Sequence, residues 1–242
     1  MTKSRKASLL ALAVLLAAPL ARSDSIQGSA HSGWQNGTNG AYWNNPSWDG
    51  PARNIGDCLG HPVNCALPAG LASAATFWGQ TSGADPHILW SSAGGPVRVT
   101  LLAELAGLAE VNRFGWFGYD PATGTVLLQQ DLFAGSTAAP AAAVFTPRPF
   151  YGFYIESGNG STYYSLSELN SAEPGGQHFA VFTGSNGEYI LGIEDLALAH
   201  GDRDYNDMIL TVRQVPEPET LVLVGLGLAG LAGLLQWRRP KR

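Results

Sequence analysis

The sequence predicts an all-β protein: an antiparallel β-sandwich of jelly-roll-like form, with a signal helix at the N-terminus and a transmembrane helix at the C-terminus. Three observations point to this fold class. The 242 residues contain 30 glycines and 15 prolines, which divide the chain by frequent turns. Only 14% of the residues are charged, against roughly 25% in an ordinary soluble domain, which excludes a coiled coil and a charged helical bundle. Between the turns, short aromatic and β-branched runs recur.

Residues 1–23 have the three regions of a secretory signal peptide. Basic residues lie within the first six positions, and an apolar run follows at 7–18 that is too short for a permanent anchor. Small residues at 21 and 23 match the positions that a signal peptidase reads, so we expect cleavage after Ser23. An uncleaved helix is the alternative.

Residues 24–86 are rich in glycine, asparagine and tryptophan and form the first part of the predicted β domain. We expect tryptophans such as Trp43 to anchor loops or strands to the core. Cys58 and Cys65 are the only cysteines, and in an exported protein such a pair predicts a disulfide. A metal site that includes His61 is disfavoured, because a fourth ligand is missing and the compartment is oxidising.

Residues 87–213 carry the clearest strand pattern and form the predicted sandwich domain. Residues 121–124, Pro-Ala-Thr-Gly, provide a turn between two of its strands. A helical turn over 101–108 is an alternative for one segment, since Ala, Leu and Glu favour helix. The predicted strands are 97–101, 114–119, 126–128, 150–155, 178–182, 189–193 and 208–212.

The charge of the chain is segregated between its ends and its middle. From residue 24 to residue 215 there are six arginines, no lysine and seventeen carboxylates, a formal charge of −11. A nucleic-acid-binding protein needs a basic stripe, so this composition excludes that partner. An acidic exported domain is better suited to a cation ligand, or to solubility alone.

The most informative segment is acidic, with five carboxylates and an asparagine within fourteen residues. Such a cluster repels itself unless protons or a cation neutralise it, and closely spaced oxygen ligands suit calcium. The spacing is not that of an EF-hand, because Asp207 stands where the glycine is required and Arg213 where the bidentate glutamate is required. A solvated turn with salt bridges around Arg203 is the alternative. The candidate ligands are Glu194, Asp195, Asp202, Asp204, Asn206 and Asp207, of which Asp207 either binds the ion or caps the turn.

Residues 214–242 form a three-part C-terminal segment. Pro216-Glu217-Pro218 precedes an apolar run at 221–235, and Arg238 begins a basic end. Fifteen helical residues span about 22 Å, less than the roughly 30 Å of a hydrocarbon core. Trp237 at the interface and snorkelling arginines make up the difference, and the basic end is expected to stay in the cytoplasm.

This C-terminal segment resembles the PEP-CTERM sorting signal of Gram-negative bacteria. The resemblance covers the last 27 residues and implies recognition by an exosortase-type membrane enzyme with cleavage near Pro216, Glu217 and Pro218. It also implies transient residence in the inner membrane, followed by release or re-anchoring at the cell surface or in the extracellular matrix. An ordinary C-terminal anchor without processing is the alternative.

Residues 87–213 resemble a domain-of-unknown-function family of exported bacterial proteins. The resemblance rests on the segments 112–117 and 150–154, and above all on Gly192-Ile193-Glu194-Asp195 with residues 202–207. It implies a β-sandwich with a calcium site at the acidic motif, and it brings no defined activity. Ile193 departs from the aromatic residue that the family usually has before Glu-Asp.

Two functions from different classes are compatible with these features. The first is a non-enzymatic, exported and calcium-stabilised β-sandwich that acts in adhesion or biofilm, or associates with extracellular polysaccharide. The second is a secreted carbohydrate-active enzyme. The chain contains no G-x-S-x-G, P-loop or H-E-x-x-H motif. A glycosidase needs two carboxylates that meet only in space, and the sequence does not select among Glu104, Glu110, Glu156 and Glu168.

Overall fold

The computed structural model describes residues 24–27, 43, 55, 76–77, 87–184, 187–215, 227 and 230. The chain divides into two compact units, one of Ser23–Val215 and one that combines Met1–Arg22 with Pro216–Arg242. Within the second unit only Gly227 and Gly230 are described, both as helical residues. Across the described residues no helix has the length and apolar character needed to cross a membrane.

Several predicted features lie outside the described residues. They are the signal helix with its cleavage position and most of the C-terminal segment with its apolar run. The cysteine pair is also outside them. The features therefore stay predictions. They are cleavage after Ser23, processing near Pro216, Glu217 and Pro218, and a disulfide between Cys58 and Cys65.

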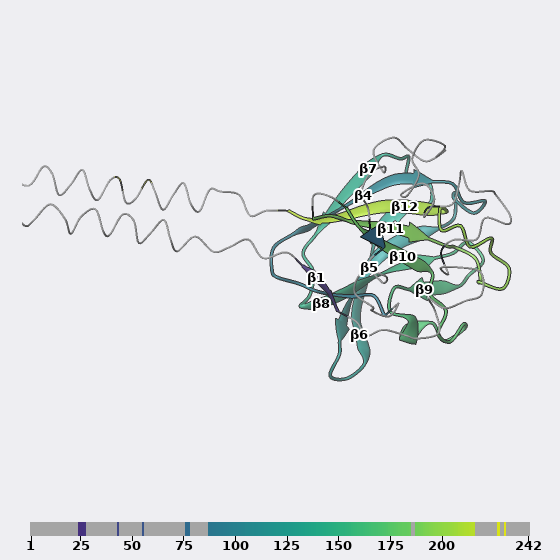
Figure 1. The fold of residues 1–242 in the computed structure, drawn as a ribbon, viewed down its shortest axis with the longest axis horizontal. Coiled ribbons are helices and arrows are strands. Elements are labelled where there is room, and N and C mark those ends of the chain that lie inside the picture. Colours follow the sequence, from purple (N-terminus) through teal and green to yellow (C-terminus); the bar gives the residue numbers. More distant parts are fainter. Residues whose placement is uncertain are drawn as a thin grey trace, which may run out of the picture. The chain divides into compact units, whose positions relative to one another are not determined.

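Two antiparallel sheets build the unit of Ser23–Val215, so the all-β prediction is confirmed (Figure 1). The first sheet has the order β1-β3-β8-β5-β6, and β9 also pairs with β8. Its strands are β1 (Ser25–Gln27), β3 (Leu89–Ser91), β8 (Phe150–Glu156), β5 (Arg113–Asp120), β6 (Thr125–Ala134) and β9 (Thr162–Tyr164).

The second sheet has the order β2-β10-β11-β12-β4-β7. A short 3-10 helix, η2 (Ser167–Leu169), lies between β9 and β10 in the chain. The strands of this sheet are β2 (Thr76–Phe77), β10 (Phe179–Thr183), β11 (Tyr189–Ile193), β12 (Met208–Gln214), β4 (Val97–Glu104) and β7 (Ala141–Phe145).

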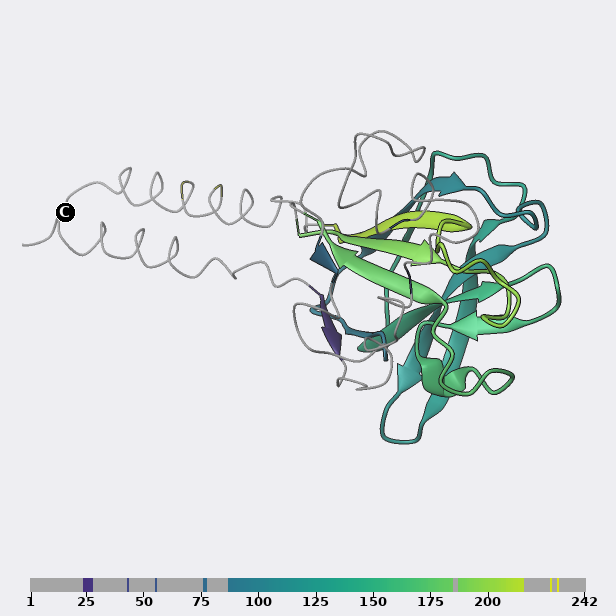
Figure 2. The same ribbon diagram turned by 45° about the vertical axis from the view of Figure 1, so that its right-hand side comes forward.

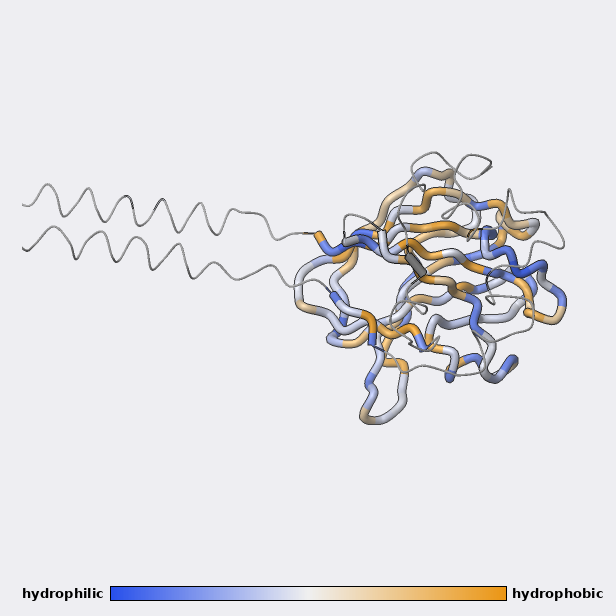
Figure 3. Tube along the Cα trace, in the orientation of Figure 1, coloured by the Kyte–Doolittle hydropathy of each residue, from blue (hydrophilic) through white to orange (hydrophobic). Residues whose placement is uncertain are grey.

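The core between the sheets follows from the period of two along each strand. In β10, Phe179 and Val181 belong to the central core, whereas Ala180 and Phe182 belong to a second apolar cluster on the opposite face. Figure 3 shows apolar residues concentrated along the strands. Each sheet can therefore also pack against other parts of the chain through its outer face.

The outer face of the second sheet is covered by distant parts of the chain. Trp43 packs edge-on against Phe182 with ring centroids 5.2 Å apart, as expected for an anchoring tryptophan. Ile55 is fully buried in the same cluster, next to Tyr205 from the acidic loop. This cluster holds the acidic loop against the sheet.

Both ends of this unit are fixed to one turn. The carboxylate of Asp24 accepts hydrogen bonds from the Tyr151 hydroxyl and the Ala93 backbone nitrogen, each 2.7 Å long. The backbone nitrogen of Val215 donates to the carbonyl oxygen of Pro96 over 2.8 Å. The loop between β11 and β12 lies at the other end of the unit from β1, in both views (Figures 1 and 2).

Candidate metal centre

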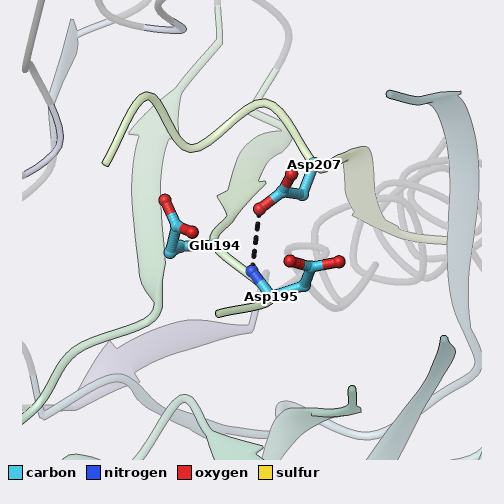
Figure 4. Close-up of side chains that lie close together, drawn as sticks. All are labelled: Glu194, Asp195 and Asp207. Atoms are coloured by element: carbon cyan, nitrogen blue, oxygen red, sulfur yellow. Dashed lines mark hydrogen bonds between the residues drawn. The ribbon is translucent and has the colours of Figure 1, made fainter. Parts of the chain in front are cut away.

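The acidic residues meet because two antiparallel strands end together. Glu194 and Asp195 follow β11 directly, and Asp207 immediately precedes β12. Ile193 and Met208 are register partners in the ladder of these strands. The backbone nitrogen of Asp195 donates a 2.8 Å hydrogen bond to Oδ2 of Asp207 (Figure 4). The end of this strand pair therefore concentrates carboxylates.

The carboxylates form two overlapping groups of three. In each group, one oxygen from every residue lies within 4.8 Å of the others. Oxygens that ligate one calcium ion at 2.3–2.6 Å can be up to about 5 Å apart, so both groups have suitable dimensions. Glu194 is shared, and the groups are Glu194, Asp195, Asp207 and Glu194, Asp202, Asp204.

The backbone of the loop is folded tightly around Glu194. Arg203 and Tyr205 have φ angles of 59° and 57°, in the left-handed region that non-glycine residues rarely adopt. The backbone nitrogen of Arg203 donates to Oε2 of Glu194 over 2.8 Å, and the hydroxyl of Tyr205 donates to the Gln177 carbonyl over 2.6 Å. These contacts hold the strained backbone in place.

Gly201 completes the enclosure of Glu194. A Cβ atom at this position would collide with Oε1 of Glu194, so only glycine lets the loop approach so closely. Glu194 is in consequence almost fully buried, with 1% of its surface exposed. Buried carboxylates require charged or hydrogen-bonding partners, so this enclosure favours a bound cation.

Asp204 and Asn206 lie beside each other in the loop. The backbone nitrogen of Asn206 donates to Oδ1 of Asp204 over 3.1 Å, and its side-chain amide donates to Oδ2. Asp204 and Asn206 are buried, while Asp202 and Asp207 are half-buried. The structure thus brings the predicted candidates to one loop, with Asn206 in contact with Asp204.

Arg203 does not neutralise this cluster. Its side chain is exposed, and its Nε donates to the carbonyl oxygen of Leu198 over 2.7 Å. Within the described part of the chain no ion pair joins Arg203 to a carboxylate. The geometry therefore does not match a solvated turn organised by salt bridges to this arginine.

Asn112 supports the site from the start of another strand, a role that sequence reasoning missed. Its Nδ2 donates to Oδ2 of Asp195 over 2.7 Å, and its Oδ1 accepts from the backbone nitrogen of Gly158 over 3.0 Å. Asn112 is completely buried. The one available signal was its position at the start of the motif at 112–117, directly before β5.

A buried histidine supports the site from behind, and sequence reasoning did not single it out. His178 bridges the Glu194 carbonyl oxygen and the Glu173 carboxylate through its two ring nitrogens, each at 3.0 Å. Tyr163 stacks on the ring with centroids 3.6 Å apart. Glu173 also accepts hydrogen bonds from the backbone nitrogen of Leu198. The pair thus fixes both ends of the segment that follows β11.

Burial and mutual repulsion raise the pKa values of these carboxyl groups. Burial, and then the charges of Asp202 and Asp204, raise the pKa of Glu194 to about 8. Burial, followed by the charges of Glu194 and Asp195, raises the pKa of Asp207 to about 10. Burial also raises the pKa of Asp195. At neutral pH this arrangement holds protons unless a cation takes their place.

Comparisons with known families agree with parts of this description. A family model described as Domain of unknown function (DUF4114) matches residues 144–214, a shorter span than the 87–213 expected from the sequence. A model described as PEP-CTERM protein-sorting motif matches residues 214–239. No curated protein matches the chain. The sorting motif implies an exported protein that associates transiently with the membrane and is processed by an exosortase-type enzyme.

Proposed function

We propose that this protein is a calcium-stabilised, non-enzymatic component of the cell surface or extracellular matrix of a Gram-negative bacterium. The observation that carries the proposal is the shared focus of the buried carboxylates around Glu194. Calcium accepts six to eight oxygen ligands in flexible geometry, which suits a loop that offers carboxylates from both sides. The candidate ligands remain Glu194, Asp195, Asp202, Asp204, Asn206 and Asp207.

A calcium ion at this site would replace the protons of the buried carboxyl groups. Ionising Glu194 and Asp207 together in the buried site is unfavourable, as their raised pKa values indicate. A divalent cation at the focus reverses that balance and favours the ionised carboxylates. Calcium therefore stabilises the loop when it is bound. The exported protein would take the ion from its surroundings outside the cytoplasm.

The position of the loop and the sorting motif support the proposed extracellular role. The loop lies at the end of the unit away from β1, whereas Val215, which precedes the processing motif, is fixed near Pro96. We propose that the protein contributes to adhesion or biofilm, in association with extracellular polysaccharide.

The proposal is tested by thermal unfolding of the purified exported protein with chelator and with added calcium. At a calcium concentration 100 times the dissociation constant, stabilisation of about 2.7 kcal/mol is expected. Asp202→Asn should reduce the gain, and Glu168→Gln, at a surface site outside the loop, should preserve it. An identical melting temperature with chelator and with calcium would exclude a structural calcium site.

A second measurement separates a matrix protein from a carbohydrate-active enzyme. Glycan-array binding without release of reducing sugar is expected for the matrix protein. Time-dependent release of product from a bound polysaccharide would instead establish an enzyme. The calcium dependence of unfolding does not bear on this choice, so the two experiments are independent.

A further inference from the structure

A cavity of about 530 Å³ lies beside the end of β4, outside the calcium loop. It is bounded by Glu104, by residues 109–110 before β5, and by residues 135–139 after β6. The described residues that line it carry two carboxylates, two hydroxyl groups and small apolar side chains, and none of them is basic. The described lining is therefore rich in hydrogen-bond acceptors and contributes no positive charge.

Glu104 is the unusual member of this lining. Its Oε1 is enclosed by protein and accepts no hydrogen bond among the described residues. Leaving a buried carboxylate oxygen without a partner is costly, so this group needs a proton or a positively charged donor. Burial, and then the charge of Asp195, raise its pKa to about 7. Glu104 is also one of the residues that line the cavity.

The protein does not provide that positive charge within the described residues. Arg113, which begins β5, interacts with Asp131 at 3.6 Å. Glu110, the second carboxylate of the cavity, is exposed and forms no ion pair in the part of the chain that the structure describes. Among the described residues, then, no basic side chain neutralises this pair.

The size and lining of the cavity favour an organic cation over a second metal ion. Glu104 belongs to neither group of three carboxylates whose oxygens lie within 4.8 Å of one another. A volume of about 530 Å³ greatly exceeds the roughly 30 Å³ that one water molecule occupies. The methyl groups of Ala109 and Ala138 offer apolar contact for an alkyl chain.

We propose that this cavity binds a primary ammonium or guanidinium group carried on a short alkyl chain. The carboxylate of Glu104 accepts the charged donor, Glu110 adds attraction at the rim, and the hydroxyl of Ser136 lies among the lining groups. The same chemistry occurs in a lysine or arginine side chain of a partner polypeptide and in a free amine. None of the described residues that line this site belongs to the calcium loop, and the proposal does not depend on the function proposed above.

The test measures binding of n-butylamine to the full exported protein in the presence of calcium, by calorimetry or chemical-shift titration. n-Butanol, which has the same alkyl chain without the charge, is the matched ligand control. Glu104→Gln is expected to weaken amine binding about tenfold or more, the usual size of a charge-assisted hydrogen bond. Glu110→Gln should weaken it about twofold, as expected for an exposed charge. Glu168→Gln should change nothing.

The binding measurements either support or overturn the proposed amine site. Equal binding of n-butanol and n-butylamine, or unchanged amine binding by Glu104→Gln, would overturn it. The thermal shift with calcium is measured on the same variant and is expected to persist. Its loss together with amine binding would show that Glu104 belongs to the calcium site, which also overturns the proposal. A lysine peptide that binds more tightly than n-butylamine would support a polypeptide source, and equal affinity would support a free amine.

Discussion

The backbone nitrogen of Asp195 donates a hydrogen bond to the carboxylate of Asp207, twelve residues later in the chain, over 2.8 Å. Because this bond joins the end of β11 to the start of β12, it closes the acidic loop at its base. The carboxylates between these points are thereby gathered around Glu194 rather than spread into solvent.

The stability of the protein without calcium should fall as the pH rises. The folded-state pKa values, about 8 for Glu194 and about 10 for Asp207, lie above the values near 4 expected in the unfolded chain. Their stabilising contribution is fully present below about pH 4 and is lost as the pH rises through the folded values. With calcium bound the carboxylates are ionised in the folded and the unfolded chain alike above about pH 4, so stability should stay level there instead of falling. Unfolding by urea at several pH values, with chelator or calcium, measures both slopes.

Replacing Glu194 by glutamine provides the control for this pH dependence. The amide cannot ionise, so the slope measured with chelator should become shallower above about pH 5. The same variant should lose most of its response to calcium. A pH slope in chelator that is the same as in the wild type would contradict the assignment of the effect to this carboxyl group.

Glu173→Gln should weaken calcium binding although Glu173 is not a candidate ligand. The carboxylate fixes His178 and the backbone nitrogen of Leu198, so its loss loosens both ends of the segment after β11. Groups that orient metal ligands typically change affinity by about 10- to 100-fold when mutated. A calcium titration followed by intrinsic fluorescence measures the affinity.

The chain offers a matched control for this variant. His87 and Glu168 form another histidine–carboxylate pair, 3.5 Å apart, and Glu168 is exposed. Glu168→Gln should leave calcium affinity unchanged. If both variants shift the affinity equally, the Glu173–His178 pair has no special role in the loop.

Gly201→Ala should impair calcium binding and destabilise the protein. The added methyl group collides with Oε1 of Glu194, so either the loop or the carboxylate must move. Overpacking of this kind typically costs about 1–3 kcal/mol. Gly107→Ala is the control, since a Cβ there meets no atom within 4 Å. Thermal unfolding with calcium should show a large difference between these two variants.

Processing of the exported chain should leave Asp24 as the first residue. Its carboxylate is held by Tyr151 and Ala93, so the new N-terminus is attached to the fold at its first side chain. Intact-mass measurement and N-terminal sequencing of the secreted protein locate this end. An N-terminus upstream of Asp24 would contradict cleavage after Ser23. The same mass should show loss of the segment that follows Pro216, Glu217 and Pro218.

Loss of the Asp24 contacts should also affect stability. Asp24→Ala leaves the buried hydroxyl of Tyr151 without its acceptor, which typically costs about 1–3 kcal/mol. Asp120→Ala, at the end of β5, is a suitable comparison because the hydrogen bonds of Asp120 to the following turn are exposed to solvent. Equal destabilisation by the two substitutions would argue against a fixed N-terminus.

Local patterns were sufficient for the central strands and for the acidic loop. Short runs of apolar and β-branched residues at 189–193 and 208–212, bounded by turns, predicted β11 and β12, because such residues favour strands. The strand after 97 extends to Glu104, and a turn rather than a helix follows it. β7 was not predicted, since Ala141-Ala142-Ala143 has weak strand propensity and pairs only through contact with β4.

The amino-acid order alone identified an all-β exported chain, its acidic loop and its sorting segment, because turns, strand periods and charge runs are local properties of a sequence. The fold selected the neighbours of those acids. Asn112 lies 83 positions from Asp195 along the chain, and His178 lies 16 positions from Glu194, yet both contact the loop. It also left Glu104 with an unpaired oxygen beside a cavity. Such contacts depend on which strands pair and how the sheets pack, so burial and charge at the site emerge only when the chain has closed around it.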